Sequence, residues 1–155
     1  MLLVFALLLL TVLFVFSQPP SPQRVMRSFY DSAQRAEDEM MDPLILAGEQ
    51  VIPLVMSEIQ NKGMKHRLYA LLFIGNSQYA EGVPVLMRIV NDPEEEGAFR
   101  AAALDAIAMI DTARGSSLSM SFRESDGPLG MAARRILAGD LVKRRTYEQA
   151  RRGHE

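Results

Sequence analysis

Residues 83–107 read VPVLMRIVNDPEEEGAFRAAALDAI, and this stretch decides the fold. Apolar residues recur at three- and four-residue steps over 83–90 and again from Gly97 to Ile110, which predicts two amphipathic helices. Four acidic residues between positions 92 and 96 separate them. The stretch therefore predicts a helical hairpin, in which two short helices are joined by an acidic turn.

Similar segments lie on both sides of this hairpin. Arg67 and Arg100 stand 33 residues apart in related surroundings, Pro53 and Pro84 stand 31 apart, and an alanine-containing pattern continues 30 residues after Ala103. Helix pairs that repeat at such a period stack side by side, and each unit buries the apolar face of the next. We therefore expect an all-α fold: a short right-handed α-solenoid of about three helix hairpins, preceded by an N-terminal apolar helix.

In each repeat unit, the second helix has a small residue at the equivalent position. Ala70, Ala103 and Ala133 are expected to let neighbouring helices approach closely. The larger residues Ile74, Ile107 and Leu137 are expected to fill the layer between units.

The remaining helices follow from periodicity and from stop signals. We expect a helix over 24–41 that ends at Asp42-Pro43, because the residue before a proline is disfavoured in a helix. Further helices are expected over 44–47, 51–60, 65–74, from 112 onward and over 128–138, with Gly63 as a left-handed cap. Asp111 and Asp126 each precede a helix, as N-caps do. The tail after residue 140 is compatible with either a charged helix or disorder.

The middle hairpin has a pattern that extends beyond periodicity. It runs Ala80-x-x-Val83-Pro84-x-Leu86, then an acidic turn, then Arg100-x-x-Ala103-x-x-Ala106-Ile107. This pattern resembles the short HEAT-like repeats, including those called phycobilin-lyase HEAT-like, and the likeness extends over 44–139. The third unit departs from it, with Ser116 in the place of the proline and Gly130 in the place of the arginine. The resemblance implies an α-solenoid, and it suggests a chromophore-lyase-like enzyme or chaperone as an alternative function.

The first 16 residues carry no charged side chain. As a helix they would span roughly 24 Å, which lies between a long signal-peptide core and a minimal membrane anchor. We therefore divide the chain into a signal peptide or membrane anchor (1–17), a linker (18–23), a HEAT-like α-solenoid (24–139) and a basic tail (140–155). We expect a membrane-anchored or exported protein with its soluble domain outside the cytoplasm. Arg24 and Arg27 after the apolar run favour the alternative, an anchored domain that stays in the cytoplasm.

The sequence contains few residues that could carry chemistry. It has no cysteine, and its histidines are His66, between two basic residues, and His154 near the C-terminus. The acidic segment 92–96 lacks the alternating spacing and central glycine of a calcium loop. We therefore expect no enzyme activity, no cofactor and no metal site. The net charge of −2 also gives no reason to expect nucleic-acid binding.

These observations favour a non-catalytic protein–protein interaction module. We expect a membrane-tethered or exported adaptor, an accessory subunit of a larger, membrane-associated complex, that is attached to the membrane through residues 1–16. Its partner is expected to bind the surface of the second helices and the basic C-terminal segment. The candidate contact residues are Arg67, Arg100, Arg134, Arg135, Lys143, Arg144 and Arg145. For Arg67 and Arg100, a structural role is the alternative, in which each guanidinium bonds a neighbouring carboxylate or carbonyl.

Overall fold

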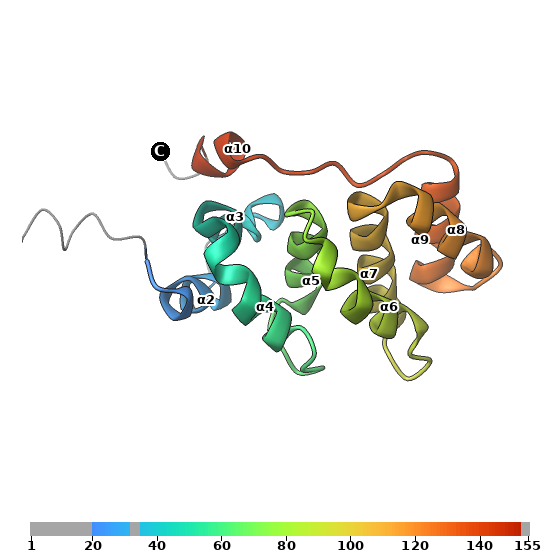
Figure 1. The fold of residues 1–155 in the computed structure, drawn as a ribbon, viewed down its shortest axis with the longest axis horizontal. Helices are drawn as coiled ribbons and strands as arrows, with labels where there is room; N and C mark the ends of the chain where they lie inside the picture. The colour runs from blue at the N-terminus through green and yellow to red at the C-terminus, as the bar shows by residue number, and fades with distance from the viewer. Residues whose placement is uncertain (1–19, 32–34, 153–155) are drawn as a thin grey trace, which may run out of the picture.

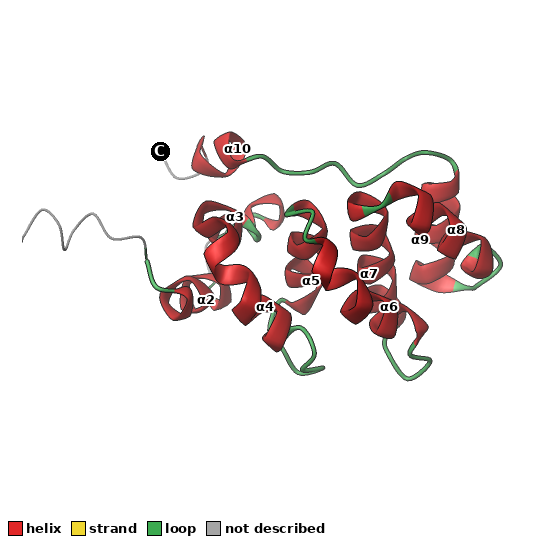
Figure 2. Cartoon of the chain, in the orientation of Figure 1, coloured by secondary structure: helices red, strands yellow, loops and turns green. Residues whose placement is uncertain are grey.

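The structure is a computed structural model that describes residues 20–31 and 35–152. Its elements are α2 (Pro22–Tyr30), η1 (Glu37–Glu39), α3 (Asp42–Ala47), η2 (Gly48–Val51), α4 (Ile52–Glu58), α5 (Arg67–Asn76), η3 (Ala80–Gly82), α6 (Val83–Asn91), α7 (Gly97–Ile110), α8 (Thr112–Phe122), α9 (Gly127–Leu137) and α10 (Tyr147–Arg152). Among these residues no strand occurs, as Figure 2 shows. The all-α prediction is confirmed, whereas the expected apolar helix lies outside the described residues.

The helices follow one another along the long axis of the molecule, from α2 at one end to α8 and α9 at the other (Figure 1). Helix α7 is central and packs against α5, α6, α8 and α9. Every residue from Ala101 to Met109 is buried as a result. The binding surface that we expected on the second helices is therefore interrupted, because the middle one is covered on most sides.

Polar contacts join each helical hairpin to the one about thirty residues further along the chain. The Lys62 ammonium lies 2.8 Å from the Asp92 carboxylate, and the Arg67 guanidinium lies 2.9 Å from Glu95. These pairs are separated by 30 and 28 residues, respectively, and both join the first hairpin to the second. Asp105 of α7 and Arg135 of α9, which are 30 residues apart, form an ion pair that joins the second hairpin to the third. The sequence repeat is thus matched by a recurring contact in space, which is consistent with the expected α-solenoid.

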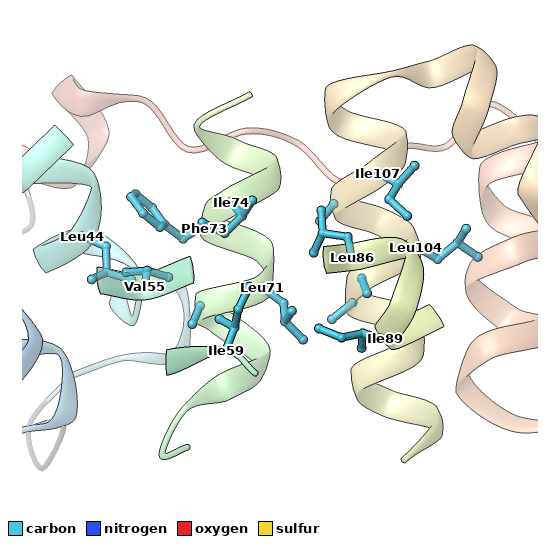
Figure 3. Close-up of a cluster of buried hydrophobic side chains, with 14 of the residues drawn as sticks. Leu44, Val55, Ile59, Leu71, Phe73, Ile74, Leu86, Ile89, Leu104 and Ile107 are labelled. Atoms are coloured by element: carbon cyan, nitrogen blue, oxygen red, sulfur yellow. The ribbon is translucent and has the colours of Figure 1, made fainter. Parts of the chain in front are cut away.

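One continuous apolar core runs through the row of helices, and Figure 3 shows its central part from α3 to α7. The three alanines at positions 70, 103 and 133 are fully buried, as are Ile74 and Ile107. Full burial of an isoleucine stabilises a fold by about 1.5–3 kcal/mol. Leu137 differs from this prediction: it is 37% exposed, at the end of α9, and residues 138–146 that follow it form no helix.

Two glycines set the closest approaches between helices. A Cβ added to Gly75 would lie 2.6 Å from the Cα of Ala106, and one added to Gly115 would lie 2.5 Å from the Cα of Ala108. Such distances exclude a side chain, so α5 and α8 each touch the backbone of α7. Gly75 therefore belongs inside α5, where it serves packing.

The prediction of a single helix over 24–41 is wrong, because the first helix of this segment ends at Tyr30. Helix α2 ends there, and the Arg35 guanidinium donates hydrogen bonds to the carbonyl oxygens of Ser28 and Asp31. The Asp42-Pro43 pair begins α3 rather than ending a helix. A proline is well tolerated in the first turn, where its missing N–H has no helical partner.

The expectations for helix ends have mixed outcomes. Asp111 caps α8, since its carboxylate accepts a hydrogen bond of 3.0 Å from the Arg114 amide. Asp126 precedes α9 but makes no such bond. The left-handed residue before α5 is His66, with φ of 58°, whereas Gly63 has no positive φ.

The C-terminal tail forms part of the fold. After α9 the chain runs without helical structure to residue 146, and α10 then packs against α3. In Figure 1 this return segment passes beside the row of helices and brings α10 back to the end where α2 lies. We call residues 138–146 the strap.

Candidate partner-binding surfaces

Arg67 is enclosed by the fold. Its side chain is 2% exposed, and its guanidinium bonds the Glu95 carboxylate at 2.9 Å and the Ile59 carbonyl oxygen at 2.7 Å. The guanidinium carbon also lies 5.0 Å from the centre of the Phe99 ring, which is a cation–π distance. Arg67 thus has the structural role that the sequence left open, and its charge does not reach the surface.

Arg100 makes the equivalent contacts one unit later. Its Nε donates to the Val90 carbonyl oxygen at 2.8 Å, and its guanidinium carbon lies 5.6 Å from the Phe122 ring centre. Val90 is in the last turn of α6, where carbonyl groups have no helical partner. Arg100 therefore joins the two helices of its hairpin, and this explains why an arginine recurs at this position.

In the third unit Arg134 takes over this role. Its Nη1 donates to the Arg123 carbonyl oxygen, just after α8, at 2.6 Å. A Cβ added to Gly130 would lie 1.7 Å from the Ser125 carbonyl oxygen, so no side chain fits at that position. The arginine comes instead from one helical turn later, which the sequence alignment at Gly130 did not reveal.

Arg135 forms an ion pair with a buried carboxylate of α7. Its Nη2 lies 2.5 Å and 2.7 Å from the two carboxylate oxygens of Asp105, which is 9% exposed. Burial raises the pKa of Asp105, and it outweighs the opposing effect of the Arg135 charge and hydrogen bond. Both short contacts come from a single guanidinium nitrogen, so the pair differs from the parallel two-nitrogen fork that arginine often forms with a carboxylate.

Arg145 fastens the strap to the body of the molecule. Its Nε and Nη2 bond the two oxygens of Asp42 at 2.5 Å and 2.8 Å, and the Asp42 side chain is fully buried. The Asn76 amide also pairs in both directions with the backbone of Arg145, at 3.0 Å and 2.7 Å. Arg145 is therefore engaged within the chain. Its neighbours Lys143 and Arg144 are exposed and form no ion pair within the described residues.

A hollow on α7 and α9 is the best candidate for a partner-binding surface. It has a volume of about 590 Å³. Its lining residues are Ala101, Asp105, Pro128, Met131, Ala132, Arg134 and Arg135. Met131 is 65% exposed, which leaves a large apolar side chain in solvent beside two guanidinium groups. We call this the α7–α9 hollow; it contains two of the predicted contact residues, Arg134 and Arg135.

The described residues contain no cluster of three or more potential metal ligands. A hollow of about 430 Å³ next to η3 is lined by Glu49 and Glu81 together with apolar, amide and hydroxyl side chains. Burial and the neighbouring Lys65 lower the pKa of His66, whose ring packs edge-on against Phe29.

Sequence reasoning missed three features of these surfaces. The sequence around Asp42 predicts a helix end within an acidic patch, the sequence around Asn76 predicts a helix end, and no site role is predicted for Asp42, Asn76 or Met131. The buried Asp42 had no detectable signal, since its partner lies 103 residues away. Met131 could have been found, because it lies three residues after Pro128 on the side of α9 away from Leu129, Ala133 and Ile136.

No helix in residues 20–31 and 35–152 has the length and apolar character needed to cross a bilayer. Comparisons with protein-family models, with curated proteins and with solved structures find no match for this chain. The proposed function therefore rests on the arrangement of residues in this structure.

Proposed function

We propose that this protein is a non-catalytic adaptor, a right-handed α-solenoid of three helix hairpins that is tethered to a membrane and binds a protein partner. Residues 1–16 provide the tether, and the domain lies outside the cytoplasm. The partner belongs to a membrane-associated complex of which this chain is an accessory subunit. The recurring contacts between hairpins and the apolar N-terminal run support this proposal.

The main support for the proposed partner binding is the exposure of Met131 in the α7–α9 hollow. A methionine that is 65% exposed beside an apolar lining is typical of an adaptable binding surface. Arg135 at its border is already paired with Asp105, whereas Arg134 bonds only backbone carbonyl oxygens, so the preferred partner presents an apolar side chain next to a carboxylate that reaches Arg134. Helix α9 also lies at the end of the molecule opposite α2, so the hollow is far from the point where the chain leaves toward the membrane (Figure 1).

The test is copurification of the tagged full chain from native membranes solubilised in mild detergent. The wild-type chain should elute in a stoichiometric complex, and Met131→Glu should lower the yield of the partner at least tenfold, since a buried hot-spot residue contributes about 2 kcal/mol or more. Met120→Glu is the matched control, because Met120 is 53% exposed on α8 and does not line the hollow. A chain that elutes alone at its endogenous level, or two variants with equal effects, would refute the proposal.

A further inference from the structure

A second surface lies at the opposite end of the molecule, where α2, α3 and α10 meet. A cavity of about 470 Å³ opens between them and is lined mainly by apolar residues. Val25 comes from α2, Leu46 and Ala47 come from α3, and Tyr147 comes from α10 and is 53% exposed. Segments that are more than a hundred residues apart in sequence thus form one end face.

Four exposed arginines belong to this end. Arg24 and Arg27 lie one helical turn apart on α2, and Arg24 lines the same cavity as Tyr147. Arg151 and Arg152 end α10, which runs toward the same side of the molecule in Figure 1. We call these four arginines, with Tyr147, the basic end face.

The acidic residues of the N-terminal region are mostly directed elsewhere. In η1, the Asp38 carboxylate lies 3.6 Å from Arg145 of the strap, and the Glu37 carboxylate accepts a hydrogen bond from the Tyr69 hydroxyl on α5. Asp31 and Glu148 remain near the basic end face and reduce its charge. Arg24, Arg27 and Arg152 outnumber these two carboxylates even when Arg151 is left out of the count, so this end keeps an excess of positive charge.

The apolar residues 1–16 precede this surface directly, since the described chain begins at Pro20. A membrane that takes up those residues would lie against α2 and α10. Arginines next to a bilayer are attracted by anionic headgroups on whichever side of the membrane the facing leaflet contains them, and tyrosine favours the interface. We propose that the basic end face binds the anionic phospholipid headgroups of the membrane, and so fixes the orientation of the domain on its tether.

This inference rests on the membrane tether of the proposed function, and it adds the lipid class and the contact residues. In this proposal the strap positions the basic end face, because the Arg145–Asp42 pair holds α10 beside α3. The proposed orientation also directs the α7–α9 hollow away from the bilayer, where a partner can reach it.

The experiment uses the full chain in vesicles of phosphatidylcholine alone or of phosphatidylcholine mixed with phosphatidylglycerol. The sequence has no cysteine, so Gln23→Cys on α2 accepts a single environment-sensitive fluorophore. We expect a blue shift of its emission on the mixed vesicles only, reversed by salt because surface charges are screened. A label at Ser117→Cys on α8 should show no shift.

Substitution then identifies the contact residues. Each arginine removed should reduce the ratio of bound to unbound domain about fivefold, so Arg24→Gln with Arg27→Gln should abolish most of the shift. The matched control is Arg114→Gln with Arg123→Gln, two exposed arginines at the other end of the molecule.

Vesicle flotation separates this inference from the tether itself. If the chain floats with both vesicle types but its emission is the same on both, the basic end face does not bind anionic lipid and the inference is wrong. If it floats only with the mixed vesicles and needs Arg24 and Arg27, the end face binds lipid and the tether is refuted. A chain that floats with neither vesicle type would overturn both.

Discussion

Replacing Glu95 with alanine should strongly destabilise the fold, because it leaves the charge of Arg67 buried without a counterion. The two side chains are 2% and 3% exposed and 2.9 Å apart. Removing one partner of such a pair costs about 3–5 kcal/mol, since the remaining ion has neither water nor an opposite charge. The bond from Arg67 to the Ile59 carbonyl does not involve Glu95, so the loss comes from the ion pair and from the 3.2 Å hydrogen bond that the Glu96 amide donates to the Glu95 carboxylate.

The assay is denaturant and thermal unfolding of the full chain, followed by circular dichroism in one fixed detergent. At 4 kcal/mol the melting temperature should fall by roughly 12 °C for a chain of this size. Glu94→Ala is the matched control: it removes an adjacent, exposed carboxylate and should change the free energy of unfolding by less than about 0.5 kcal/mol.

A double variant tests the cause. Arg67→Met combined with Glu95→Leu removes both charges, so it should recover most of the lost stability. If Glu95→Ala loses less than about 1 kcal/mol, or if it behaves like Glu94→Ala, the burial argument is wrong.

Three further predictions concern the strap, a buried carboxylate and a helix contact. Arg145→Ala should release the strap and expose the segment 138–152 to trypsin and to amide exchange, whereas Arg144→Ala, at an exposed neighbouring position, should leave both unchanged. Burial raises the pKa of Asp105 in the folded state. The stabilisation that results from this shift is complete when the pH is below the pKa of Asp105 in the unfolded chain, and it is lost as the pH rises through the pKa of Asp105 in the folded state. Wild type should therefore gain stability relative to Asp105→Asn when unfolding is measured at pH 3 instead of pH 7, and a difference independent of pH would contradict this. Gly75→Ala should destabilise the fold by about 1–3 kcal/mol, because its Cβ would meet the α7 backbone. Gly63→Ala, which meets only the end of a side chain, should have a much smaller effect on the unfolding midpoint.

In our proposals the two ends of the molecule have different roles: the basic end face contacts the membrane, and the α7–α9 hollow contacts the protein partner. Helices α2 and α10 form the end that faces the membrane in our proposal, and α9 presents Met131 at the other end. The central helix α7 links them; it contributes Ala101 and Asp105 to the α7–α9 hollow, and the rest of its buried stretch is covered by neighbouring helices. In this arrangement, the number of hairpins sets the distance between the bilayer and the partner.

The sequence by itself determined the all-helical fold and the positions of most of the helices. The bounds of α7 were predicted to the residue, because the signals that begin and end it lie within the segment. The burial of Ala70, Ala103 and Ala133 followed from their shared place in the repeat. Helix periodicity is a local property, so local reasoning captures it.

Only the tertiary structure decided which charges are buried and which remain on the surface. Glu95 looks like its exposed neighbours in an acidic run, yet it lies inside the fold because Arg67 reaches it from the preceding hairpin. The strap is held by a pair 103 residues apart, and no periodic pattern encodes such a contact. The physical reason is that an ion pair depends on where two side chains meet in space, whereas the sequence records only where each one begins along the chain.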